Sequence, residues 1–282
     1  MILSGGDAVK KLKKSENRLL SWSWADEGFE EILTSIRLSR PEMSGAAGLI
    51  NESAGKMVWR LKRYNSDGKE YDFAYKINPG KTPWRYIFKP SLAMREALNY
   101  RMFENMGIPV AHLLAVGDLR RIFLLKENYI ATTFVAESLD GRCFMPGGSM
   151  QDDDELRLEF SMRNMELLAK IHDRKIFHKA FHPRNLLWKG TVGNMQVSWI
   201  DVARCRPVSW FMSMPRVVLV DLHTFLRDMQ PHRAELEQIV EHYLNCRKNG
   251  SYPGGAHRLI DDLYNFKRRL FSKKRYTINR GE

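Results

Sequence analysis

The chain has 282 residues, 44% of them hydrophobic, which is enough for one large domain or two smaller ones with a substantial core. Lys and Arg number 45 against 33 Asp and Glu, giving a formal net charge of +12 at pH 7 and a pI near 9.6. The composition is that of an ordinary globular protein. Its charge favours anionic partners such as nucleic acid, a phosphorylated glycolipid or an acidic membrane surface, without choosing among them.

The three cysteines, Cys143, Cys205 and Cys246, are widely spaced and odd in number. They fit neither a zinc site nor a disulfide framework, which favours a reducing compartment. The N-terminus lacks a basic-then-apolar signal pattern, and no apolar run approaches the roughly 18 to 20 residues that span a bilayer. We therefore expect a soluble or peripheral protein, not an integral membrane protein.

Residues 1–43 are interpreted as a polar extension that includes a short helix over residues 24–40, which Pro41 would stop. Two strands then follow, over residues 56–64 and 70–77, joined by a turn that contains Asp67 and Gly68. On the second strand, alternation predicts one face made of Tyr71, Phe73, Tyr75 and Ile77, and an opposite face made of Asp72, Ala74 and Lys76.

Residues 91–106 predict a helix with Ser91 as N-cap and Leu98, Met102 and Met106 at helical spacing, ended by Gly107 and Pro109. Two or three more strands end near residue 137. An acidic turn then opens a helix over residues 152–172, with an apolar stripe of Leu158, Met162, Met165, Leu168 and His172.

Strands with one inserted helix, followed mostly by helices, predict an α+β fold in two lobes. The predicted division is an N-terminal extension over 1–43, a strand-rich N-lobe over 44–136 and a helical C-lobe over 137–282.

Lys76 and Glu96 are separated by 20 residues, one on a strand and one in the middle of the next helix. Either residue alone has an ordinary explanation as a surface charge. Together, in the pattern FAYK followed by a helix glutamate, they match the pair with which kinases position the α and β phosphates of ATP.

The stretch HKAFHPRN, residues 178–185, has the skeleton of a kinase catalytic loop. In such a loop the His holds the backbone, and the Asn seven residues later, here Asn185, gives a neutral oxygen to Mg²⁺. A hairpin over residues 186–202 then brings Asp201 to a strand end, where a metal-binding carboxylate belongs. Lys76, Glu96, His178, Asn185 and Asp201 occur in the order that a protein-kinase-like fold requires.

Three segments of the chain together resemble the lipopolysaccharide core kinase family, the heptose and Kdo kinases of Gram-negative bacteria. They are residues 80–118, the loop HKAFHPRNLLW and the segment WIDVARCRP. The resemblance spans roughly residues 57 to 230. In that family the metal-binding Asp opens the pattern D-x-x-R-x-R, matched here by Asp201, Arg204 and Arg206. The resemblance also implies that Asp221 braces the catalytic loop, and it places tentative acceptor contacts at the two arginines.

The resemblance implies a bilobal fold that binds ATP and Mg²⁺. It also implies transfer of the γ-phosphate to a heptose or Kdo hydroxyl of the inner core, by a peripheral protein on the cytoplasmic face of the inner membrane. The positive charge suits that acceptor and an anionic leaflet, which the basic tail over 266–282 could contact. No nucleic-acid motif accompanies the charge, so we expect no nucleic-acid partner.

Ala180 occupies the position of the catalytic Asp, which orients the acceptor hydroxyl and takes its proton. We therefore expect the chain to bind Mg-ATP and to transfer phosphate very slowly. One origin is a natural pseudokinase that binds nucleotide as a regulator. The other is a deliberate Asp-to-Ala exchange, favoured because the other interdependent positions remain; the parent gene would then encode Asp.

Two further departures concern the nucleotide site. No GxGxxG pattern precedes the strands, so the glycine-containing segment 44–55 does not locate a phosphate-covering loop. Arg184 replaces the Gly that is common in related HP loops. The adenine contacts are expected near Phe134 and Ala136. A small-molecule phosphotransferase stays open as an alternative, because its catalytic loops share the HP variant.

Overall fold

The computed structural model describes residues 19–35, 47–53, 56–80, 82–121, 123–248 and 252–266. The chain forms two compact units. Unit 1 contains residues 1–105 and 111–135, and unit 2 contains residues 106–110 and 136–282. The division into an extension and two lobes at residues 43 and 136 stays a prediction.

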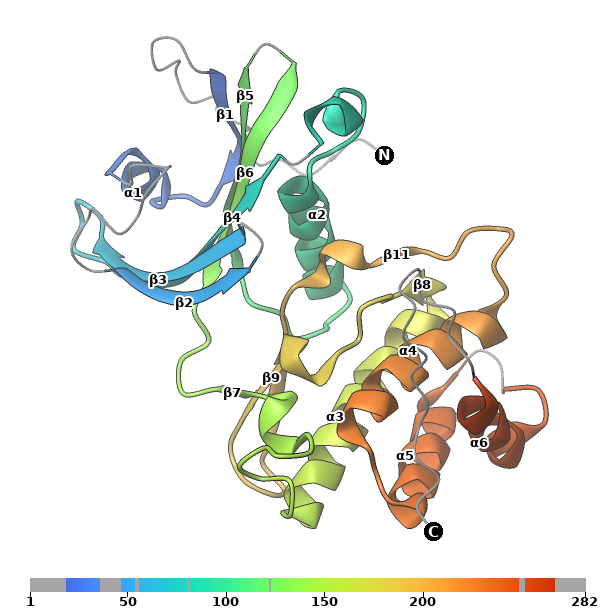
Figure 1. Cartoon of the computed structure of the whole chain (residues 1–282). Helices are drawn as coiled ribbons and strands as arrows, with labels where there is room; N and C mark the ends of the chain where they lie inside the picture. Colours follow the sequence, from blue (N-terminus) through green and yellow to red (C-terminus); the bar gives the residue numbers. More distant parts are fainter. Residues whose placement is uncertain are drawn as a thin grey trace. The chain divides into compact units, whose positions relative to one another are not determined.

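Unit 1 is built on an antiparallel six-stranded sheet in the order β1-β5-β6-β4-β3-β2 (Figure 1). The strands are β1 (Leu19–Ala25), β2 (Ala47–Ser53), β3 (Lys56–Tyr64), β4 (Glu70–Pro79), β5 (Leu113–Arg121) and β6 (Leu124–Thr133). The predicted strands over residues 56–64 and 70–77 are confirmed as β3 and β4. The segment 44–55 supplies strand β2, and residues 54 and 55, which join it to β3, lie outside the described residues.

The predicted helix over residues 24–40 is wrong at its start. Residues 19–25 form strand β1, which pairs with β5, and the helix α1 (Glu30–Ser35) begins only after Gly28. The sequence LLSWSWA alternates in a way that suits a strand, and Gly28 takes a φ of 79°, which favours glycine and separates strand from helix. Residues 36–40, where the helix was expected to continue, lie outside the described residues.

Strand β4 has the two faces that its alternation predicts. Tyr71, Phe73, Tyr75 and Ile77 are buried in one core cluster together with the first residues of α1. The ring of Phe29 packs edge-on against that of Phe73, with their centroids 4.9 Å apart. Because successive side chains on a strand point to opposite faces, this core leaves Lys76 on the other face of the sheet.

Helix α2 (Leu92–Asn105) packs on β5 and β6. Ser91 caps it as predicted, since its Oγ accepts a hydrogen bond of 3.2 Å from the N–H of Met94. The apolar face differs from the predicted stripe, because Leu98 is 40% exposed. The residues that α2 buries are Ala93, Glu96, Ala97, Tyr100 and Phe103.

Unit 2 is mainly helical (Figure 1). Its helices are α3 (Asp154–Asp173), α4 (Met214–Met229), α5 (Arg233–Cys246) and α6 (Gly255–Asn265). Its short strands are β7 (Leu139–Asp140), β8 (Ile176–Phe177), β9 (Leu186–Lys189), β10 (Gln196–Trp199) and β11 (Arg206–Pro207). The predicted hairpin over residues 186–202 is confirmed as β9 and β10.

On α3, Met165, Leu168 and His172 are buried as predicted, whereas Leu158 and Met162 are only half-buried. The α+β class is confirmed. Of the basic tail predicted over 266–282, only Phe266 belongs to the described residues.

The packing of unit 1 predicts that Phe73→Ala destabilises the protein. The side chain is fully buried against Phe29, so its removal leaves a cavity and is expected to cost about 3–5 kcal/mol of unfolding free energy. Tyr64→Ala is the matched control, because this aromatic side chain on β3 is 65% exposed and its loss should cost only about 0.5 kcal/mol. Equal unfolding midpoints for the two variants would contradict this core.

Candidate functional site

In unit 1, Lys76 on β4 forms an ion pair with Glu96 on α2. The ammonium Nζ lies 2.8 Å from both carboxylate oxygens. The side chains are 11% and 2% exposed, so both charges are shielded from water. A buried pair of this geometry fixes the direction of an otherwise flexible lysine. The predicted partners therefore meet.

Asn128 on β6 fixes the start of the helix that carries Glu96. This buried side chain accepts hydrogen bonds at its Oδ1 from the N–H of Ala93, at 2.9 Å, and from Asn78 Nδ2, at 3.2 Å. Its own Nδ2 donates to the carbonyl of Asn78 at 3.2 Å. The first turn of α2 is thereby tied to the end of β4 and to the middle of β6, one turn before Glu96. The sequence analysis did not include this contact.

In unit 2, Asp221 on α4 holds the backbone of the loop that begins at His178. Its carboxylate accepts hydrogen bonds from the N–H groups of His178, at 2.9 Å, and of Lys179, at 2.8 Å. Lys179 has a φ of 66°, a left-handed conformation that is uncommon outside glycine and that occurs here between two anchored peptide groups. This geometry agrees with the bracing role expected for Asp221.

Asp221 is itself held by two helices. The Nε2 atom of His172, on α3, lies 3.1 Å from Asp221 Oδ2. Its Nδ1 atom lies 2.7 Å from the hydroxyl oxygen of Tyr243, on α5. Arg247 in turn donates to the Tyr243 hydroxyl at 2.9 Å. The sequence analysis included His172 only in an apolar stripe. A polar side chain within an apolar stripe was the feature of the sequence that could have indicated a buried hydrogen-bond partner.

The ring of His178 packs between Phe181 and Trp199, with its centroid 5.1 Å from each. Both ring nitrogens are buried and have no hydrogen-bond partner within the described residues. Burial lowers the pKa of His178 to about 4. His178 was expected to hold the loop backbone, but the hydrogen bonds that do so come from Asp221, while His178 contributes a neutral ring to the aromatic packing.

Ala180 contributes only backbone to the loop. Its carbonyl accepts hydrogen bonds from the N–H of His182, at 2.9 Å, and from Asn185 Nδ2, at 3.2 Å. With the amide nitrogen of Asn185 in this bond, Oδ1 is the atom that Asn185 can offer to a cation. Arg184, the departure from the HP pattern, is exposed on the turn η4 (Pro183–Asn185).

Asp201 follows β10 and has a φ of 53°, also left-handed. The strand before it is fixed by Trp199, whose Nε1 donates to Asn164 Oδ1 at 2.8 Å. The N–H of Ile200 donates to the carbonyl of Asn185 at 2.9 Å, so the segments that carry Asn185 and Asp201 are linked directly. Oxygen ligands from an amide and a carboxylate suit Mg²⁺.

The two arginines after Asp201 are exposed. Arg204 ends the turn η5 (Val202–Arg204), and the guanidinium of Arg206 lies 5.8 Å from the ring centroid of Phe177.

Phe134 and Ala136 belong to different units. The N–H of Phe134 donates to the carbonyl of Asp72 at 2.9 Å, and the guanidinium of Arg60 lies 4.0 Å from its ring centroid. Ala136 is exposed.

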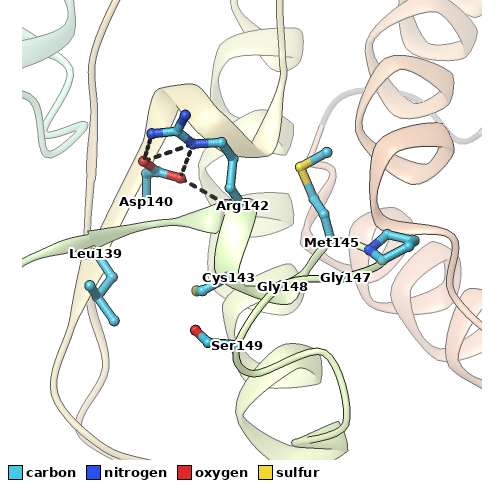
Figure 2. Close-up of a pocket in the computed structure, with 9 residues that line it drawn as sticks. Leu139, Asp140, Arg142, Cys143, Met145, Gly147, Gly148 and Ser149 are labelled. Carbon is cyan, nitrogen blue, oxygen red and sulfur yellow. Dashed lines mark hydrogen bonds and ion pairs between the residues drawn. The ribbon is translucent and has the colours of Figure 1, made fainter. Parts of the chain in front are cut away.

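Figure 2 shows an open hollow of about 500 Å³ in unit 2 that contains none of the predicted site residues. It is lined by residues 139–149, apart from Gly141 and Phe144. Its charged side chains, Asp140 and Arg142, are paired with each other through two-pronged contacts of 2.6–3.1 Å. This hollow therefore offers no unpaired charge to a ligand.

Within the described ranges, no group of three or more His, Cys, Asp or Glu side chains is placed to hold a metal by itself. The pair of Asn185 and Asp201 differs from such a site, because a nucleotide-bound Mg²⁺ takes most of its ligands from phosphates and water.

The fold is protein-kinase-like, with an antiparallel sheet and the helices α1 and α2 in the first unit and a helical second unit. A solved structure described as WaaP in complex with acyl carrier protein matches it with a TM-score of 0.55 and 14% sequence identity, over 86% of this chain and 92% of that chain. The structure of the PknI kinase domain of Mycobacterium tuberculosis, a C20A_R136N double mutant, matches with a TM-score of 0.44 and 13% sequence identity. The match covers 77% of this chain and 94% of that chain.

Residues 62–243 match the lipopolysaccharide kinase (Kdo/WaaP) family, and the chain belongs to this family. The predicted family is thus confirmed over more than half of the chain. Membership implies a phosphotransferase that uses ATP. Among curated proteins, no sequence matches this chain. None of the helices in the described part of the chain has the length and apolarity to cross a membrane.

The buried His178 predicts a specific pH dependence of stability. Its pKa of about 4 in the folded protein, against 6.5 when exposed, means that the unfolded chain binds a proton first as the pH falls. The contribution of the neutral His178 to the free energy of unfolding is intact above pH 6.5 and is lost as the pH falls to 4. The total loss is on the order of 3 kcal/mol.

His178→Phe keeps an aromatic ring between Phe181 and Trp199 and removes this titration. Chemical denaturation at a series of pH values should show a flatter decline for the variant than for the unaltered protein between pH 6.5 and 4. Parallel curves would contradict the assignment of a neutral, buried His178.

Proposed function

We propose that this protein binds Mg-ATP in the manner of a lipopolysaccharide inner-core sugar kinase and that Ala180 keeps its phosphoryl transfer very slow. The observation that carries the proposal is the intact hydrogen-bond framework around a position that lacks its carboxylate. The Lys76–Glu96 pair is formed, and Asp221 holds the loop in which Ala180 lies. The family match supplies the sugar-kinase class.

Each polar residue has a role that follows from its chemistry. Lys76, oriented by Glu96, contacts oxygens of the α and β phosphates. Asn185 and Asp201 would hold Mg²⁺, which would neutralise charge on the phosphates. Phe134 and Ala136 are proposed to lie at the adenine.

The missing step is proton removal from the acceptor hydroxyl. A carboxylate at position 180 would accept that proton and orient the attacking oxygen, and a methyl group does neither. Loss of a general base typically lowers the rate by about 10²–10⁴-fold. The chain would therefore hold nucleotide and acceptor with little turnover.

The proposed acceptor is a heptose or Kdo hydroxyl of the inner core. Its carboxylates and phosphates suit the exposed Arg204 and Arg206 and the net charge of +12. This acceptor would be met by a peripheral protein at the cytoplasmic face of the inner membrane. No nucleic-acid partner is proposed.

Ala180→Asp should restore transfer of labelled γ-phosphate from Mg-ATP to dephosphorylated inner-core lipopolysaccharide, by about 10²-fold or more over the unaltered chain. Ala180→Asn is the matched control, because it has nearly the same shape and cannot take a proton at neutral pH. Transfer by the Asp variant alone would identify the missing base.

Two other results have distinct meanings. If neither variant transfers label while all forms bind Mg-ATP, a natural pseudokinase acting as a nucleotide-binding regulator replaces this proposal. If the Asp variant phosphorylates small sugars or aminoglycosides but no lipopolysaccharide, the protein is a small-molecule phosphotransferase. Equal transfer by the Asp and Asn variants would contradict the role assigned to position 180.

A further inference from the structure

Three large aromatic side chains of unit 1 are directed into solvent. Trp84 is 72% exposed, Phe88 96% and Phe123 71%. Trp84 lies in the turn η2 (Pro83–Tyr86), Phe88 follows it, and Phe123 lies between strands β5 and β6. A soluble surface normally avoids gathering such side chains, and where they do gather they mark an interaction site.

Arg120 holds these two segments side by side. Its Nη1 donates to the carbonyl of Tyr86 at 3.0 Å and to the carbonyl of Phe123 at 3.2 Å. Its Nη2 and Nε contact Asp118 at 2.8 and 3.3 Å, which fixes the guanidinium. In Figure 1 the short teal turn of η2 accordingly lies near the far end of the β5–β6 hairpin. Arg120 thereby holds the segments that carry the three aromatic residues close together.

The same surface is basic. Arg85, Lys89 and Arg121 are exposed beside the aromatic residues. Residues 83–90 and 120–126 contain no Asp or Glu, and the nearby Asp118 is buried and paired with Arg120. We call Trp84, Phe88, Phe123, Arg85, Lys89 and Arg121 the aromatic–basic surface.

The chain also enters the sheet at this end. Leu19, the first residue of β1, pairs with Arg120 of β5. The 18 residues before it carry five basic and two acidic side chains, namely Lys10, Lys11, Lys13, Lys14 and Arg18 against Asp7 and Glu16. Their net charge has the same sign as that of the aromatic–basic surface.

We propose that the aromatic–basic surface docks unit 1 on an anionic lipid bilayer. Trp and Phe side chains favour the interface between head groups and acyl chains, while Lys and Arg are attracted to anionic head groups. The combination of protruding aromatic rings with an unbroken positive charge suits a bilayer better than a folded acidic partner, whose interface would bury such rings in pockets. The proposal does not depend on catalysis.

Unit 2 offers a matched comparison. Trp210 and Phe211, in the segment before α4, are 96% and 72% exposed, with ring centroids 5.9 Å apart. This pair is aromatic and exposed, like the aromatic–basic surface. It lies in a single segment, whereas the aromatic–basic surface is made of two segments that Arg120 joins.

The test is sedimentation of the full-length chain with vesicles, without ATP or acceptor. The protein should bind vesicles of phosphatidylethanolamine with phosphatidylglycerol, and not vesicles of phosphatidylcholine alone. The triple variant Trp84→Ser, Phe88→Ser, Phe123→Ser should lower the partition coefficient by at least about ten-fold. The variant Arg85→Glu, Lys89→Glu, Arg121→Glu should lower it by about five-fold for each basic side chain removed.

Trp210→Ser with Phe211→Ser is the control and should bind as the unaltered chain does. All substituted side chains are exposed, so thermal unfolding midpoints should stay unchanged. If the aromatic variant were unfolded, vesicle binding by the charge variant alone would test the proposal. The proposal is overturned if the chain does not bind anionic vesicles, or if both variants bind them as well as the unaltered chain. It is also overturned if the control loses binding as the aromatic variant does.

Discussion

The buried carboxylate of Asp221 is the interaction on which the candidate site in unit 2 depends. The Asp221 side chain on α4 accepts hydrogen bonds from two backbone N–H groups of the loop. It also contacts His172 of α3, which in turn contacts the hydroxyl of Tyr243 on α5. A buried charge without partners would be strongly destabilising, so these contacts must all form together. The loop geometry is therefore a property of the helical core.

This arrangement makes the loop independent of the side chain at position 180. The contacts that shape the loop use peptide groups of His178, Lys179 and Ala180 and the amide of Asn185. The side chain of Ala180 makes none of these contacts. The proposed function requires that nucleotide binding be retained while phosphoryl transfer is slow.

Local patterns predicted much of unit 1. The alternation in β4, the Ser91 cap and the 20-residue spacing from Lys76 to Glu96 each depend on neighbours in sequence or on one familiar motif. Strand β1 was missed because its pairing with β5 joins residues 90 to 101 positions apart, and a short alternating stretch does not reveal such a partner. The anchoring of α2 by Asn128, across 35 positions, was missed for the same reason.

The site in unit 2 shows the same division. The kinase-like motif selected Asn185 and Asp201 as metal ligands, which stays a prediction, whereas the contacts of His172 and His178 are set by the tertiary structure. His172 proved to be a partner of Asp221, and His178 a neutral ring among aromatic side chains. The polarity of a residue does not tell whether its partner is a backbone group, a carboxylate or only an aromatic ring.

The proposed function requires a magnesium-dependent nucleotide site in a chain that has Ala180 at the position expected for the catalytic Asp. Calorimetric titration of the full-length chain with ATP, once with Mg²⁺ and once with EDTA, tests it most directly, with Asp201→Asn in parallel. We expect saturable binding at one site with Mg²⁺, weakened by about ten-fold or more in EDTA and in the variant. No saturable binding, or an affinity that depends neither on Mg²⁺ nor on Asp201, would contradict the account.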